Sequence, residues 1–121
     1  MTQPTTRIAY FNGKFVPETH VLIPYRDRSF NRGDGCFDMT RTFDGRIFRL
    51  AEHVERLYRS LRYLRIDIGL EPKEIVAISE EVVEKNEPLR AAAGAARDRR
   101  LNRHREPVHT PVISHPDGGP A

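Results

Sequence analysis

The chain has 121 residues, of which 38% are hydrophobic and 31% charged, and its formal net charge is +3. This length accommodates one modest domain and excludes two well-buried ones. The single cysteine, Cys36, excludes an internal disulfide and is typical of a reducing compartment. No apolar run reaches the roughly 18 residues of a membrane helix, and the N-terminus has no apolar signal core. We therefore expect a cytoplasmic protein.

The first half of the chain predicts two hairpins joined by a loop. Asn-Gly and Asp-Gly accept the positive φ angles that tight turns require. The expected elements are the hairpin Ile8–Phe11 with Lys14–Val16, a short strand Val21–Ile23 ended by Pro24, a loop over residues 25–35, and a strand Cys36–Phe43 that Asp44-Gly45 turns into Arg46–Arg49.

Two helices are expected next. Between Leu50 and Leu64 the apolar residues recur every three or four positions, which makes one buried stripe. This stripe contains Leu50, Val54, Leu57, Leu61 and Leu64. Pro72 suits the first turn of a second helix that runs to about Lys85, with Asn86 as a left-handed cap. The stripe of this helix contains Ile75, Ile78 and Val82.

The composition changes at residue 90. Residues 1–89 contain 14 Lys/Arg and 14 Asp/Glu, whereas residues 90–121 contain six Arg and three acids, so the tail carries the whole net charge. The aromatic residues all lie at or before Tyr63. We expect a domain over residues 1–89 and a tail over residues 90–121 that is not a packed element. Disorder and a shifted reading frame both explain that tail.

The strand Cys36–Phe43 has two different faces. Alternation places Phe37, Met39, Arg41 and Phe43 on one face, and Cys36, Asp38, Thr40 and Thr42 on the other. The first face either packs on the helix stripe, which periodicity alone favours, or lines a ligand pocket. Arg56 lies beside the buried Leu57 and is either solvated or offers its planar fork to a phosphate.

Several motifs in order resemble one family. They are Arg26–Asp38, Phe43–Leu57 and Leu61–Ile66, with the opening Tyr10–Val16 and the closing Val82–Asn86. About residues 8–89 thus resemble the N-terminal domain of class IV aminotransferases, the fold-type-IV pyridoxal-phosphate enzymes. Members include branched-chain and D-amino-acid aminotransferases, (R)-selective amine transaminases and aminodeoxychorismate lyase. The resemblance implies an α+β fold, in which a small antiparallel sheet of hairpins packs with two helices.

The resemblance also implies roles for individual residues. Arg56 matches the arginine of a His-x-x-Arg-Leu motif that binds the cofactor phosphate, and His53 of that motif is expected to be structural. Phe37 matches an aromatic residue on the substrate side of the cofactor. By alternation, Met39 and Arg41 are its neighbours in the substrate pocket.

Two departures from the family pattern concern the substrate pocket. Arg32 stands where an aromatic residue is usual, and Phe37-Asp38-Met39 replaces the Phe-Glu-Gly of typical branched-chain enzymes. These changes place the chain nearer the D-amino-acid, amine and lyase branches.

The implied reaction moves an amino group between an amino acid or amine and a 2-oxo acid, with pyridoxal 5'-phosphate as cofactor and a homodimer as the usual assembly. A lyase reaction stays open. Lys14, Lys73 and Lys85 do not match the Schiff-base lysine, so we expect a truncated or frame-shifted member that holds no catalytic residue, is inactive alone and leaves a sheet edge open. No metal site is expected.

A binding module of another class is the rival interpretation. The arginine-rich segment Arg97–Arg105 would contact nucleic acid or another polyanion through charge alone. No aromatic residue accompanies it for base stacking, which disfavours this function.

Overall fold

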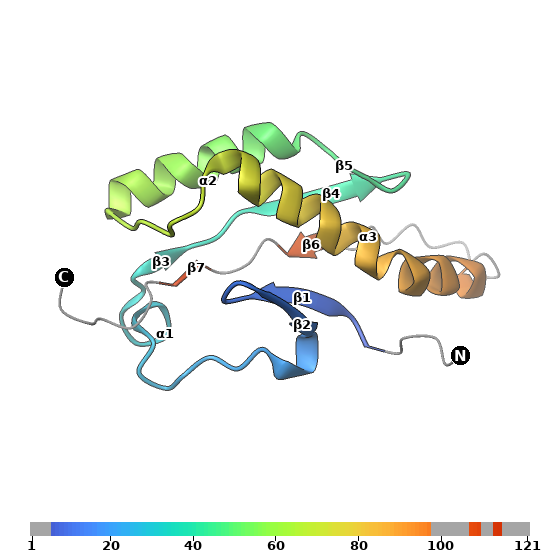
Figure 1. The fold of residues 1–121 in the computed structure, drawn as a ribbon, viewed down its shortest axis with the longest axis horizontal. Helices are drawn as coiled ribbons and strands as arrows, with labels where there is room; N and C mark the ends of the chain where they lie inside the picture. The colour runs from blue at the N-terminus through green and yellow to red at the C-terminus, as the bar shows by residue number, and fades with distance from the viewer. Residues whose placement is uncertain (1–5, 98–106, 110–112, 115–121) are drawn as a thin grey trace.

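The computed structural model describes residues 6–97, 107–109 and 113–114. Figure 1 shows an α+β arrangement in which α2 lies along β3 and β4, and α3 crosses from α2 to the β1–β2 hairpin. This confirms the predicted fold class. In chain order the elements are β1 (Ile8–Phe11), β2 (Lys14–Pro17), the 3-10 helix η1 (Glu18–His20), α1 (Arg28–Arg32), β3 (Gly35–Cys36), β4 (Met39–Phe43), β5 (Arg46–Ile47), α2 (Leu50–Leu64), α3 (Pro72–Arg97), β6 (Pro107–His109) and β7 (Ile113–Ser114).

Both predicted hairpins are confirmed. β1 and β2 pair antiparallel around Asn12 and Gly13, whose φ angles are 49° and 85°. β4 and β5 pair antiparallel around Asp44 and Gly45, with φ angles of 49° and 81°. These positive φ values are why a small or short polar residue is needed at each turn.

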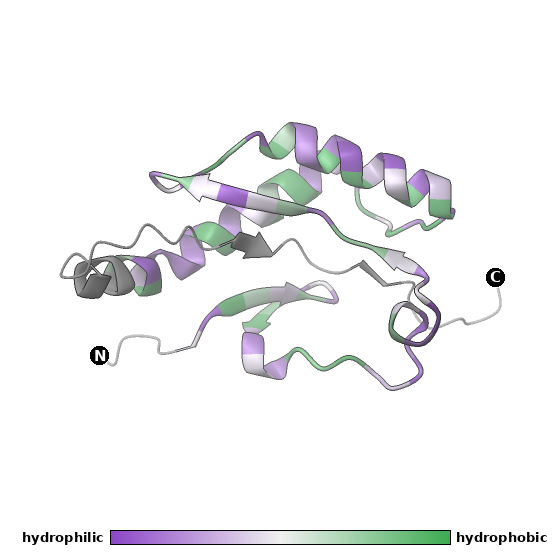
Figure 2. Ribbon diagram, turned by 180° about the vertical axis from the view of Figure 1, so that it is seen from behind, coloured by the Kyte–Doolittle hydropathy of each residue, from purple (hydrophilic) through white to green (hydrophobic). Residues whose placement is uncertain are grey.

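Helix α2 has the predicted bounds, and its stripe forms the centre of the core. Leu50 and Val54 pack with Ile75 of α3, and Leu57 and Leu61 pack with Ile66 beyond the end of α2. Figure 2 shows hydrophobic and hydrophilic stretches alternating along α2, as expected of a helix with one apolar face. The core thus lies where α2 meets the start of α3 and the strands beneath α2.

Helix α3 is longer than predicted. The helix does not end near Lys85, and Asn86 is not a left-handed cap, because α3 continues through Pro88 to Arg97. The alanines of Ala91–Ala96 have the highest helix propensity, and Gly94 costs only about 1 kcal/mol relative to alanine. The side chain of Asn86 instead hydrogen-bonds both backbone groups of Ile8 in β1.

Three local predictions before α2 were wrong. Val21–Ile23 is not a strand; Leu22 and Ile23 are exposed and pair with no strand in the described part of the chain. The loop over residues 25–35 contains α1, because the Asp27 carboxylate accepts a hydrogen bond from the Ser29 backbone N–H at the start of this short helix. The strand Cys36–Phe43 is interrupted at residues 37–38, which separates β3 from β4.

The described part of the tail also corrects the prediction. β6 pairs antiparallel with β4, and β7 pairs antiparallel with β3. Unpaired backbone groups along the edge of β4 attract a further strand, so the edge that was expected to stay open carries β6, and the tail does supply strands. The predicted boundary between residues 89 and 90 falls inside α3. Most of the tail for which disorder or a frame shift was predicted lies outside the described residues. The same is true of the predicted polyanion-binding segment Arg97–Arg105, apart from Arg97.

The described ranges contain neither a membrane-spanning helix nor a metal-binding cluster. None of the helices there is long and apolar enough to cross a membrane. No group of three or more His, Cys, Asp or Glu side chains in those ranges is arranged to hold a metal ion.

Candidate functional site

A buried carboxylate joins the strands to helix α2. Asp38 lies between β3 and β4, and only 4% of its side chain is exposed. Its Oδ2 atom accepts from Nε of Arg56 at 2.7 Å, and its Oδ1 atom accepts from Nη2 of Arg56 at 2.8 Å. Nδ1 of His53 lies 2.7 Å from the same Oδ1. Asp38 therefore holds two side chains of α2 at once.

The local sequence explains this arrangement. His53 and Arg56 are three residues apart, so they lie on one side of α2, next to the buried Val54 and Leu57. Strand alternation directs Asp38 to the same face as the buried Thr40. Packing of the apolar stripe onto this face brings the carboxylate against the two polar side chains.

The charges of this cluster support an ionised Asp38. The hydrogen bond from Arg56 holds the pKa of the Asp38 carboxyl below its usual range, with a smaller contribution from His53. The same hydrogen bond raises the pKa of Arg56. An ionised carboxylate only accepts hydrogen bonds, so Nδ1 of His53 carries a proton and donates a hydrogen bond to Asp38. Nδ1 then has no lone pair for Nη2 of Arg56, which lies 3.3 Å away.

Arg56 also lines an open groove. The Arg56 side chain is 57% exposed, and no residue in the described part of the chain accepts a hydrogen bond from its Nη1. The groove has a volume of about 450 Å³ and contains two arginines and no carboxylate in its lining: Cys36, Arg56, Arg59, Ser60, Tyr63 and Leu64. Burial raises the pKa of the Cys36 thiol, which favours its neutral form. The donors in this groove suit an oxyanion such as a phosphate.

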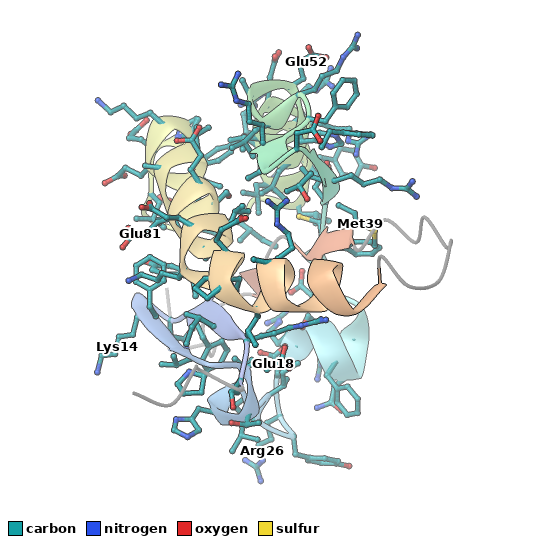
Figure 3. All side chains as sticks on the ribbon, turned by 90° about the vertical axis from the view of Figure 1, so that its right-hand side faces the viewer. Lys14, Glu18, Arg26, Met39, Glu52 and Glu81 are labelled. Carbon is teal, nitrogen blue, oxygen red and sulfur yellow. The ribbon has the colours of Figure 1, made fainter. Side chains whose placement is uncertain are left out.

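The opposite strand face is exposed. Phe37 is 69% exposed and Met39 43% exposed, and Arg41 is exposed beside them, whereas Asp38 and Thr40 are buried. Figure 3 shows Met39 on the side of the molecule away from Glu81 of α3. Of the two alternatives for this Phe/Met face, packing on the helix stripe is therefore excluded, because α2 covers the Asp38 face instead.

The structure brings together some of the predicted site residues. Phe37, Met39 and Arg41 share the exposed strand face, and Arg56 lies on the other side with Asp38. Arg32 ends α1 as an exposed residue before Gly33, whose φ is 64°. No hydrogen bond or ion pair among the described residues joins Arg32 to the other four.

Sequence reasoning missed two groups. Alternation assigned Asp38 to the correct face but did not show its role. The signal for that role is an acidic residue on the strand face that packs against a helix in which His53 and Arg56 are three residues apart. Arg59 was not singled out, and it lines the groove beside Arg56 and Ser60. His53, expected to be structural, is paired with Asp38.

Comparison with known proteins identifies the family. Residues 35–109 match the model of the family described as amino-transferase class IV. The D-alanine aminotransferase of Staphylococcus haemolyticus is 31% identical over 77 residues, which cover 64% of this chain and 27% of the relative. The chain therefore belongs to the class IV aminotransferase family.

Solved structures agree with this assignment. A T.th. branched-chain amino acid aminotransferase, in complex with N-(5'-phosphopyridoxyl)-L-glutamate, has a TM-score of 0.63 and 32% identity, and the match covers 69% of this chain and 30% of that one. The branched-chain aminotransferase of Thermoproteus uzoniensis with norvaline has a TM-score of 0.61 and 28% identity, with 67% and 29% covered. This chain thus spans less than a third of the length of the relatives that it matches.

Proposed function

We propose that residues 35–64 form the phosphate-binding side of a pyridoxal 5'-phosphate site in an aminotransferase, with Arg56 as the group that binds the phosphate. The observation that carries this proposal is that only part of the Arg56 guanidinium is bonded within the described chain. Its Nε and Nη2 atoms are bonded to Asp38, Nη1 has no acceptor among the described residues, and Arg56 lines a groove without acidic lining. A planar fork with free N–H groups matches the geometry of phosphate oxygens.

The donor set of the groove fits such a cofactor. Arg56 and Arg59 supply positive charge, whereas the Ser60 hydroxyl donates to the Arg56 backbone oxygen at 3.3 Å. When bound, pyridoxal 5'-phosphate supplies an electron sink for the bonds at the substrate's α-carbon. Arg56 would hold the phosphate end and keep the cofactor from leaving, while Asp38 and His53 hold Arg56.

The substrates in this proposal are an amino acid or amine and a 2-oxo acid. Phe37, Met39 and Arg41 form the substrate face of the site, on the side of the strand opposite Arg56, and Arg32 at the end of α1 belongs to the same set. Their exposure supports this role, because a large aromatic side chain and a methionine on one exposed face are typical of a surface that binds a ligand or another protein surface. The ligand of the T.th. branched-chain enzyme joins a phosphopyridoxyl group to L-glutamate, which also supports a site for both parts. A homodimer is the assembly that we propose.

We propose further that no lysine of this chain supplies the reacting amine, so that the chain alone is inactive. Lys85 forms an ion pair with Glu81 at 3.5 Å, and its Nζ lies 4.9 Å from the centre of the Phe15 ring. Lys73 is exposed in the first turn of α3. Figure 3 shows Lys14 at the hairpin, on the opposite side of the molecule from Met39.

A binding experiment tests the role of Arg56. Pyridoxine 5'-phosphate carries the phosphate but no aldehyde, so it does not react with lysines. Isothermal titration with this ligand should show affinity about tenfold weaker for Arg56→Gln than for the unchanged chain. The matched control is Arg62→Gln, which removes the same charge from an exposed position of α2 and should change affinity less than about twofold. Equal binding by the unchanged chain and Arg56→Gln would refute the proposal.

A trapping experiment tests the role of the lysines. The chain is mixed with pyridoxal 5'-phosphate, reduced with borohydride and digested for mass spectrometry. We expect low, scattered labelling of Lys14, Lys73 and Lys85 that is unchanged in Arg56→Gln. Stoichiometric labelling of one lysine that depends on Arg56 would show that the chain contains its own reacting amine.

A further inference from the structure

We infer that Asp38 is a positioning residue, which fixes the Arg56 guanidinium so that its outer edge is presented to a phosphate in the groove; this inference rests on the function proposed above. Arg56 has a long side chain that is 57% exposed, and such a side chain samples many rotamers unless it is held. Asp38 holds it at two points, Nε at 2.7 Å and Nη2 at 2.8 Å. Two bonds from one carboxylate fix both the place and the plane of the guanidinium.

The Asp38 carboxylate is itself buried and held by a second partner. Asp38 is 4% exposed and lies between β3 and β4, where the neighbouring Thr40 is also buried. His53 donates a further hydrogen bond to Asp38, at 2.7 Å from Oδ1. With both oxygens occupied, the carboxylate cannot turn without losing a partner. The buried carboxylate therefore restrains the tip of an otherwise exposed arginine.

Two opposite effects decide how phosphate binding depends on Asp38. Its negative charge repels a phosphate, but the groove is open to water, which screens that repulsion strongly. Its two hydrogen bonds remove the rotamer freedom of Arg56 before the ligand arrives, so the ligand does not have to order that side chain. We expect this pre-ordering to outweigh the screened repulsion, so removal of the carboxylate weakens binding.

A double-mutant cycle distinguishes positioning from a merely structural role. Asp38→Asn keeps the shape but turns an N–H donor toward the donors of Arg56. We expect it to weaken pyridoxine 5'-phosphate binding about fivefold when Arg56 is present, and less than about twofold in the Arg56→Gln background. An equal effect in both backgrounds, or tighter binding by Asp38→Asn, would overturn the inference. If the unchanged chain and Arg56→Gln bind alike, the proposed function fails instead.

The unchanged chain offers a second measurement that does not depend on how Asp38→Asn folds. In NMR spectra, the Nε–H proton of Arg56 should exchange slowly because it is bonded to Asp38, while that of Arg62 should exchange rapidly. Addition of pyridoxine 5'-phosphate should shift the Nη resonances of Arg56 and leave its Nε–H bonded. Rapid exchange of the Arg56 Nε–H in the free chain, or its loss of protection upon ligand binding, would show that Asp38 does not position the side chain.

Discussion

Asn86 ties helix α3 to the N-terminal hairpin, and its replacement by alanine should loosen that hairpin. Oδ1 of Asn86 accepts from the Ile8 backbone N–H at 2.8 Å, and Nδ2 donates to the Ile8 backbone oxygen at 2.8 Å. A third bond, from Nδ2 to the Val82 oxygen at 2.7 Å, lies within α3. One side chain thus serves both backbone groups of a strand residue, as a neighbouring strand would.

The magnitude follows from these contacts. Each hydrogen bond contributes about 1 kcal/mol net, so loss of the two bonds to Ile8 should lower the free energy of unfolding by about 2 kcal/mol. Alanine is a better helix former than asparagine by about 0.5 kcal/mol, which offsets part of the loss. We expect Asn86→Ala to destabilise the chain by about 1.5 kcal/mol. The neighbouring Glu87 forms an exposed pair with Arg90, so Glu87→Ala is the matched control and should cost less than about 0.5 kcal/mol.

Urea unfolding followed by circular dichroism measures the stability change, and hydrogen exchange measures the Ile8 amide directly. In Asn86→Ala this amide should lose protection even under conditions in which α2 stays folded. A change in unfolding free energy below about 0.5 kcal/mol, together with unchanged Ile8 protection, would show that Asn86 does not hold the hairpin.

Three further outcomes are expected. Leu57→Ala removes a side chain that is 1% exposed and should cost about 3 kcal/mol in urea unfolding; a loss below about 1 kcal/mol would contradict the core assignment. Arg65 ends α2 in the left-handed region, with a φ of 57°, where a side chain strains the backbone and glycine does not. Arg65→Gly should therefore raise the free energy of unfolding by about 0.5–1 kcal/mol in the same assay, and a lower free energy would show that Arg65 is not strained. The hydrogen bond from Arg56 lowers the pKa of Asp38 in the folded chain below the ordinary 3.8, so its stabilisation is present above that value and is lost as the pH falls through the folded pKa. The unfolding free energies of the unchanged chain and Asp38→Asn, measured from about pH 7 to about pH 2, should therefore converge only below about pH 4, and a constant difference would refute the assignment.

Local patterns predicted the parts of the fold that depend on neighbours in the sequence. The stripe from Leu50 to Leu61 requires only that one side of a helix be buried, and the bounds of α2 were predicted correctly. Asn12-Gly13 and Asp44-Gly45 mark turns whose backbone angles few other residues adopt easily. Each of these signals lies within a few residues of the structure that it predicts.

Features that depend on distant partners could not be predicted in the same way. Asn86 suited a helix cap by its local preference, and its binding to Ile8 depends on a residue 78 positions away. β6 and β7 depend on the edges of β4 and β3, which their own sequences do not reveal. For the site, alternation separated the two strand faces, but only packing determined that the Asp38 face meets α2.

The separation of the two strand faces has a consequence for how such a protein can change. Asp38 alternates with Phe37 and Met39, so adjacent residues serve opposite surfaces. A library varied at Phe37, Met39 and Arg41 would alter the exposed face while α2 keeps its packing and Arg56 keeps its support. The exposed face and the support of Arg56 can thus vary separately, although they are encoded within a few consecutive residues.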